Sequence, residues 1–449
     1  MNTLLFLLFF IALGILYFVL GIRAAKNVTT DSDYFVANRQ LGIWQITCNL
    51  IATQLGGGML LGTAASAYTI GLQGIFYTLG MALGFLLLAC GIASRLQQFK
   101  VTTTAQLFQT QYKSPLLKKI ASLLSIITLF GILIAQVVGF KSLMASIGFG
   151  SWPAIIPFWL SVVAYTMIGG LRAITVNDMV QLAIIVTTFT TIFILTVSQQ
   201  PSAFFSLLST QKQFFTLESI SLASISSVIL IPALFSLIEQ DLAQRFFAAR
   251  SKMVATISAC NASAFLLLFA LIPVYLGMQT KIRGFALPEG ANPLIIFLQN
   301  SMPDILFALA LCSIVAAIIS TADALMNGIS ANITQDFEIA KWGKLGDSLR
   351  VSKLTTCIVG ISALIASYFV SNDIIGILIS SYELSVSCLL VPLLVCYFKK
   401  SVNKNAAFVS VLAGLFGFIV FRIYPQAIPK EILALGLSAL GYIVGNIKK

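Results

Sequence analysis

The chain has 449 residues, of which 58% are hydrophobic and only 9% charged, and its mean hydropathy is +0.97. Because soluble domains carry about 25% charged residues, this composition excludes a soluble enzyme or a disordered chain and predicts lipid as the main solvent. The net charge of +12 does not point to nucleic acid here, since membrane proteins hold Lys and Arg on cytoplasmic loops.

Apolar runs of about 20 residues recur along the chain and predict an all-α integral membrane fold with about thirteen transmembrane helices. Strands of an outer-membrane barrel would alternate polar and apolar residues, and these runs do not. The predicted spans are residues 3–22, 42–71, 72–93, 119–146, 152–169, 177–197, 223–239, 253–279, 304–331, 351–370, 373–397, 405–421 and 429–446.

The first apolar run is either a signal peptide or a membrane span. No basic residue precedes it, and Arg23 and Lys26 follow it, which favours a span that starts outside the cell. Most of the 27 Lys and Arg residues fall in the odd-numbered connections and the C-terminal tail. This bias predicts a multi-pass protein of the cytoplasmic membrane with its N-terminus outside and its C-terminus in the cytoplasm.

Two spans carry features that favour a break in the helix. The second span holds Gly56, Gly57 and Gly58 in a row, which either interrupt the helix or allow close packing. The seventh span carries Pro232, which either breaks or merely kinks it. Because the two spans are five apart, they enter the membrane in opposite directions. Paired interruptions of this kind are typical of inverted-repeat transporters, in which unwound backbone carbonyls bind ions.

Four acids lie inside or at the ends of predicted spans, where an ionisable side chain usually faces a cavity, a partner or an ion. Asp178 is either such a residue or an acid at a helix N-terminus. Glu239 is either functional or an interfacial partner of Arg245 or Arg250. Glu383 is expected to face a cavity about 15 Å deep. All basic residues fit loops or helix ends, so the predicted core has negative charges and no positive ones.

The fourth acid, Asp323, shares a helical stripe with Ala317, Ser320, Thr321 and Ala324. Small residues and hydroxyls in a stripe are consistent with close helix packing alone. An acid among hydroxyls also suits a hard cation, which prefers oxygen ligands, and Na⁺ is the predicted ion.

Five segments, in this order and spread along the chain, resemble the sodium:solute symporter family. They are TDSDYFVANRQLG, GGG–GTAASAYTIGLQG, GGLRAITVNDMVQ, EQDLAQRFFAARS and IISTADALMNGISANITQDFE. The resemblance implies a LeuT-type fold of inverted five-helix repeats with broken helices. It places the first repeat in residues 42–197 and the second in 223–397 of a single transporter domain, and makes 1–22 and 405–449 peripheral helices.

The resemblance also implies binding residues. The main sodium site of the family falls on backbone oxygens of Ala52 and Leu55 and on Ala317, Ser320 and Thr321. A second sodium, held in some members, falls on Asp178, Ser320 and Asp323, where Ala324 lacks the hydroxyl that some members use. The family's aromatic gate falls on Phe235.

The GGG–GTA segment is most similar to choline carriers of this family, whose tryptophan cage is replaced here by Gln54 and Glu239. The candidate solute contacts are Thr53, Gln54, Gln136, Phe235 and Glu383. The predicted function is a symporter that imports a small polar organic solute with Na⁺. The alternative is a transporter-like sensor that signals through a separate partner. A channel lacks a repeated filter motif, and an enzyme lacks histidine, a nucleophile motif and a metal cluster.

Overall fold

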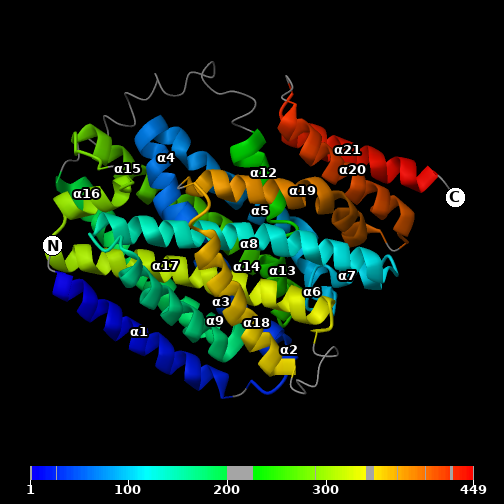
Figure 1. The fold of residues 1–449 in the computed structure, drawn as a ribbon, viewed down its shortest axis with the longest axis horizontal. Coiled ribbons are helices and arrows are strands. Elements are labelled where there is room, and N and C mark those ends of the chain that lie inside the picture. The colour runs from blue at the N-terminus through cyan, green and yellow to red at the C-terminus, as the bar shows by residue number, and fades with distance from the viewer. Residues whose placement is uncertain are drawn as a thin grey trace.

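The computed structural model describes residues 3–26, 28–199, 226–288, 290–339, 348–371, 373–399, 401–424 and 428–447, and nearly all of this part is helical (Figure 1). Within it, eleven helical stretches are long and apolar enough to cross a membrane. The all-α membrane fold is confirmed, and the count of thirteen spans is not. The helices are α1 (Thr3–Ala25), α2 (Asp31–Val36), α3 (Ile43–Gln54), α4 (Thr63–Ile70), α5 (Phe76–Leu87), α6 (Ala93–Gln98), α7 (Gln106–Thr110), α8 (Pro115–Ser146), α9 (Trp152–Gln199), α12 (Ile231–Phe235), α13 (Gln240–Ala248), α14 (Lys252–Phe269), α15 (Leu271–Ile282), α16 (Pro293–Ser301), α17 (Asp304–Ala331), α18 (Ser348–Ala366), α19 (Ile374–Phe398), α20 (Lys404–Ile423) and α21 (Lys430–Ile447).

The long helix α9 consists of two segments that meet at Gly170, between the predicted spans 152–169 and 177–197. Gly170 has a φ of 56° and a ψ of −156°, a backbone conformation that favours glycine. A Cβ atom at this position would also lie 2.4 Å from the carbonyl oxygen of Tyr34. Glycine is therefore required here both by the backbone and by the close approach of α2.

The predicted break in the second span is confirmed. Helix α3 ends at Gln54, and a π-helical turn from Gly58 to Gly62 leads into α4. Gly56 lies between them, and a Cβ there would lie 2.4 Å from Oγ1 of Thr321 on α17. Both expected roles of the glycines are therefore observed. The helix is interrupted at this point, and the missing side chain of Gly56 lets α17 pack closely against the interrupted backbone.

The seventh span is also broken, but not at Pro232. This proline follows a π-helical turn, Ser226–Leu230, and the backbone between that turn and α12 stays helical at Leu230. The interruption comes after Phe235, and Glu239 adopts a ψ of 125° before α13 begins at Gln240. Residues 223–225 of the predicted span lie outside the described residues.

Large apolar side chains cover much of the outside of the bundle. They are exposed on α1, α14, α18, α20 and α21, with Leu268 at 71% and Phe369 at 84% beyond the end of α18. Contiguous apolar surface of this kind is unfavourable in water and matches a lipid environment. The described chain therefore has the surface of a multi-pass membrane protein, in agreement with its eleven apolar helices.

The terminal helices flank the rest of the bundle. Helix α1 packs against α9 and α17, whereas α20 and α21 pack against each other and against α19. They lie on opposite sides of the molecule in Figure 1. The repeat boundaries at 42–197 and 223–397 stay a prediction.

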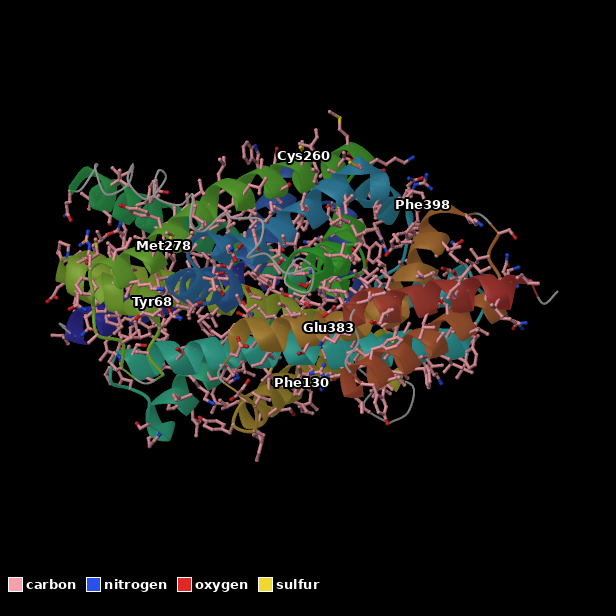
Figure 2. The ribbon with its side chains drawn as sticks, turned by 90° about the horizontal axis from the view of Figure 1, so that it is seen from above. Tyr68, Phe130, Cys260, Met278, Glu383 and Phe398 are labelled. Carbon is pink, nitrogen blue, oxygen red and sulfur yellow. The ribbon has the colours of Figure 1, made fainter. Side chains whose placement is uncertain are left out.

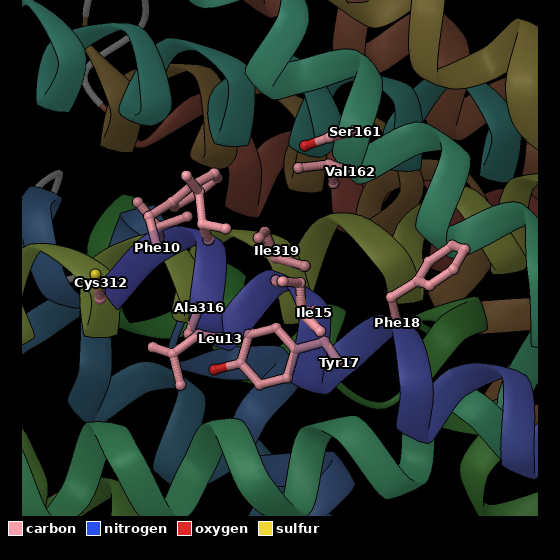
Figure 3. A pocket seen from close by; sticks show the side chains of 13 residues that line it. Phe10, Leu13, Ile15, Tyr17, Phe18, Ser161, Val162, Cys312, Ala316 and Ile319 are labelled. Carbon is pink, nitrogen blue, oxygen red and sulfur yellow. The ribbon is translucent and has the colours of Figure 1, made fainter. Parts of the chain in front are cut away.

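A cavity of about 340 Å³ lies between α1, α9 and α17 (Figure 3). Phe10 and Tyr17 of α1 and Ala316 and Ile319 of α17 contribute to its lining. The lining is almost entirely apolar, as expected for a space between a peripheral helix and the bundle. It contains neither of the helix breaks, so the polar site lies elsewhere.

Candidate functional site

Two hydroxyl groups of α17 contact the backbone at the end of α3. Ser320 Oγ donates to the carbonyl oxygen of Ala52 at 2.9 Å, and Thr321 Oγ1 donates to that of Thr53 at 2.7 Å. Both hydroxyls also lie within 3.1 Å of the carbonyl oxygen of Ala317, one turn earlier. Five oxygen atoms from two helices are thus gathered in one buried place.

This arrangement brings together four of the five residues predicted for the main sodium site. The fifth, Leu55, is fully buried at the C-terminus of α3 and precedes Gly56, which faces Thr321. Hydroxyl and carbonyl oxygens are the ligands that a hard cation prefers. The hydroxyls can rotate and turn their lone pairs to a cation, so the donor set fits Na⁺. Its binding role stays a prediction.

Replacing Gly56 with alanine is expected to lower the free energy of unfolding by about 1–3 kcal/mol, because the added methyl overlaps Thr321 Oγ1. Thermal unfolding of the purified protein measures the effect. The matched control is Gly14→Ala on α1, where a Cβ meets nothing within 4 Å. Equal melting temperatures for the two variants would contradict the close approach of α17.

The two acids predicted for a second sodium are fully buried. Asp323 on α17 accepts a hydrogen bond from the Thr166 hydroxyl. Among the described residues, neither carboxylate oxygen of Asp178 has a hydrogen-bond partner. Asp178 lies two turns beyond Gly170 inside α9, so it is not the N-terminal acid considered as an alternative. A buried carboxylate without hydrogen bonds is costly and fits a site for a cation.

The core contains a positive charge that the sequence analysis did not expect. Arg245 on α13 is only 1% exposed. Its Nε donates to Oδ1 of Asn49 and its Nη1 to the carbonyl oxygen of Asp241, whose carboxylate lies 4.0 Å away. Asn49 in turn donates to Thr175 Oγ1 at 2.8 Å, which links α3, α13 and α9.

The prediction that all basic residues occupy loops and helix ends is therefore wrong. The ion-pair partner of Arg245 is Asp241 and not Glu239, the partner considered from the sequence. The sequence did indicate this ion pair, because Asp241 and Arg245 are four residues apart and share one face of a helix. Both residues follow the predicted end of the seventh span at residue 239, which suggested a loop, whereas every residue of α13 is buried.

A small polar cavity of about 20 Å³ lies between the two broken helices, α8, α17 and α19. It brings together the predicted solute contacts Thr53, Gln54 and Gln136 with Thr321 of the candidate sodium site. Two other predicted contacts, Phe235 and Glu383, do not line it. Its lining residues are Thr53, Gln54, Gly56, Gly58, Met59, Tyr77, Ile132, Gln136, Glu239, Asp241, Thr321, Leu325, Leu378 and Tyr382.

Polar side chains bond to the unwound backbone and to each other around this cavity. Gln136 Oε1 accepts a hydrogen bond of 2.8 Å from the backbone N–H of Gly57, which is free because α3 has ended. The Gln54 amide donates to Glu239 Oε2 at 3.4 Å, across the two broken helices. Gln54 therefore connects the end of α3, whose carbonyl oxygens contact the α17 hydroxyls, to Glu239, which directly precedes α13.

Sequence reasoning missed two tyrosines. The hydroxyls of Tyr77 on α5 and Tyr382 on α19 lie 2.9 Å apart at the cavity. Phe235 stacks on Tyr382 with ring centroids 4.4 Å apart and an angle of 13° between the planes. The aromatic residue that reaches the cavity is thus Tyr382, with Phe235 behind it, and nothing in the spacing of either residue indicated this pairing.

Glu383 does not face the cavity as predicted. Its carboxylate is 3.0 Å from Nζ of Lys430 and 3.7 Å from Nη1 of Arg422, on the side of α19 where α20 and α21 lie (Figure 2). Consecutive residues of a helix point about 100° apart, so Tyr382 and Glu383 cannot both face the same small space. The predicted face of Glu383 was therefore wrong, and its predicted depth in the membrane stays a prediction.

Glu383→Gln is expected to destabilise the protein by about 1–2 kcal/mol without changing ion or solute affinity, since it removes a partner of Lys430 outside the cavity. Thermal unfolding of Glu383→Gln, Lys430→Gln and the double variant measures the coupling. Effects that simply add would show that the pair contributes nothing, and a loss of Na⁺ affinity in Glu383→Gln would contradict the placement.

Comparisons with known proteins agree with the family and with the fold. The model of the sodium:solute symporter family matches residues 34–414. A solved structure of a Na⁺-coupled sialic acid symporter, in a substrate-bound outward-open state, superposes with a TM-score of 0.81 at 17% identity. The match covers 99% of this chain and 98% of that one. A nucleobase-cation-symport-1 family transporter in a closed conformation superposes with a TM-score of 0.59 at 13% identity, over 93% and 95% of the two chains.

Proposed function

The chain belongs to the sodium:solute symporter family, and we propose that it imports a small polar organic solute together with Na⁺ by alternating access. The observation that carries the proposal is the contact of two buried α17 hydroxyls with the backbone carbonyls at the end of α3. The solute cavity adjoins this contact, because Thr53 and Thr321 belong to both.

In this proposal Na⁺ is held by carbonyl oxygens of Ala52, Leu55 and Ala317 and by the hydroxyls of Ser320 and Thr321. Such an ion would bridge α3 and α17 and so favour the conformation in which these helices are close. Asp178 and Asp323 are the acids of a proposed second ion near Ser320. Because Gln54 and Thr53 adjoin the first ion, binding of the ion and of the solute are coupled, and each raises the affinity of the other equally.

A second cavity, of about 350 Å³, supports an access path from the end of the bundle at which α16 and α19 begin. Its lining includes Gly62 of the π-helical turn and Ile375 at the start of α19. One turn deeper, Leu378 packs so close to Gly58 that a Cβ there would lie 2.5 Å from it. We propose that this end faces the outside of the cytoplasmic membrane and that α19 moves away from the broken helix to admit solute.

The decisive experiment uses Na⁺ itself as the probe. Addition of NaCl should raise the melting temperature of the purified protein, whereas equal KCl should not, because a ligand that binds the folded state stabilises it. A solute found by the same method should then enter proteoliposomes along an inward Na⁺ gradient. Identical effects of Na⁺ and K⁺ on stability and on uptake would refute sodium coupling.

A further inference from the structure

We propose that the solute is a small organic cation, a primary or secondary ammonium, and that Glu239 is the side chain that pairs with it. This inference rests on the proposed transport function and adds the charge of the solute. The central cavity is lined by two carboxylates, Glu239 and Asp241, and among the described residues that line it there is no Lys or Arg. An anion would meet both carboxylates in a buried space, whereas a cation would be attracted to them.

Glu239 and Asp241 differ in whether a positively charged side chain lies close to the carboxylate. Asp241 has the guanidinium of Arg245 at 4.0 Å. Two of the donors of Arg245 are engaged by Asn49 and by the backbone of Asp241, and Arg245 does not line the cavity. Glu239 is 6% exposed and accepts a long hydrogen bond, 3.4 Å, from Gln54. Within the described chain no Lys or Arg lies within 4.0 Å of its carboxylate.

The charge balance of the core leads to the same conclusion. Among the described residues, Asp178, Glu239 and Asp241 are buried carboxyl groups near the broken helices, and Arg245 is a buried base beside them. Uncompensated charge is expensive in a low-dielectric interior. With Arg245 and one Na⁺ present, one of these three carboxylates still lacks a positive counterpart when all three are ionised. A positively charged solute at Glu239 completes the balance.

The other polar groups of the cavity suit a donor of N–H hydrogen bonds. The phenol oxygens of Tyr77 and Tyr382 lie together, and a solute that enters between them can donate to either one. The cavity has a volume of about 20 Å³, roughly the space of one water molecule, so it must expand around a solute. Small size and several N–H donors distinguish a primary or secondary ammonium from a bulky quaternary one.

The experiment measures binding to the full-length protein in 150 mM NaCl by thermal unfolding. The probes are matched series of two to six carbons in which one terminal group is an amine, an alcohol or a carboxylate. At least one amine, protonated at pH 7, is expected to bind tenfold or more tightly than its alcohol and carboxylate counterparts. The Glu239→Gln variant should lose this preference, and Glu239→Asp should keep it.

Two controls separate this inference from the proposed transport function. Glu338→Gln makes the same chemical change at a half-exposed residue that pairs with Lys118 far from the cavity, and it should keep the preference for amines. The stabilisation by NaCl over KCl should persist in Glu239→Gln, because Glu239 is not among the proposed sodium ligands. Loss of amine preference with retained sodium response therefore supports Glu239 as the partner of the cation.

The inference is overturned when no amine of the series binds better than its alcohol and carboxylate. It is also overturned when Glu239→Gln keeps the full preference, since the charge would then be sensed elsewhere. A third contrary result is preferential binding of alcohols with uptake driven by an inward proton gradient. In that case a proton, and not the solute, neutralises Glu239.

Discussion

Ser320→Ala is expected to weaken the response to Na⁺ by about 10- to 100-fold, the largest functional effect of a single change in this chain. The hydroxyl is fully buried and contacts the carbonyl oxygens of both Ala52 and Ala317 at 2.9 Å, so its removal leaves the proposed sodium site with one oxygen ligand fewer. A hydrogen bond or ligand bond to a charged group is worth about 1.5–3 kcal/mol, which corresponds to this range of affinity. Titration of the melting temperature with NaCl measures the apparent affinity directly.

Thr321 allows a sharper form of the same prediction. Thr321→Ser keeps the oxygen atom and should retain most of the sodium response, whereas Thr321→Val keeps the shape and should lose it. Ser313→Ala is the matched control, because Ser313 is fully buried on the same helix and donates within α17 to the carbonyl of Leu309. If Ser320→Ala and Thr321→Val respond to Na⁺ as strongly as Ser313→Ala does, Ser320 and Thr321 are not sodium ligands.

Arg245→Met is expected to destabilise the protein by about 3–5 kcal/mol, the largest structural effect. The substitution fills much of the same volume but leaves the carboxylate of Asp241 without its partner and removes the donor that binds Asn49. A Lys at this position should recover only part of the loss, because an ammonium cannot reach both oxygen acceptors in the geometry of the guanidinium. Thermal unfolding in the presence of Na⁺ gives the comparison.

Two further variants make this prediction specific. Arg250→Met changes an exposed base five residues later and should leave the melting temperature within a degree or two. Asp241→Leu combined with Arg245→Met should restore part of the stability, because an apolar pair leaves no buried charge alone. A double variant that is less stable than Arg245→Met would show that the pairing with Asp241 is not what Arg245 contributes.

Local sequence features predicted most of the fold because each depends on neighbouring residues. Runs of apolar residues determine membrane helices through length and hydropathy, and glycine triplets weaken a helix wherever they occur. The break at Gly56 was therefore located to within two residues. The break after Phe235 was predicted four residues too early, because Pro232 is accommodated in a helix that continues from the preceding π-helical turn.

The contents of the core were harder to predict. Asp178 and Asp323 were expected to be buried and are, since an acid deep in an apolar run has few alternatives. The burial of Arg245 depends on how α13, which begins after the break at Glu239, packs against α3, α6 and α17. That arrangement is a property of the packed bundle, and residue spacing along α13 indicates only that Asp241 and Arg245 share a face.

By itself, the sequence determined an all-α membrane protein, the two interrupted helices, the family and the hydroxyl pair opposite the first break. Only the tertiary structure decided which side chains meet at the cavity. It brought Tyr77, Glu239 and Tyr382 together from three helices and turned Glu383 toward Lys430. The physical reason is that hydropathy records depth along a helix, whereas the face that a residue presents is determined by how its helix is rotated against its neighbours.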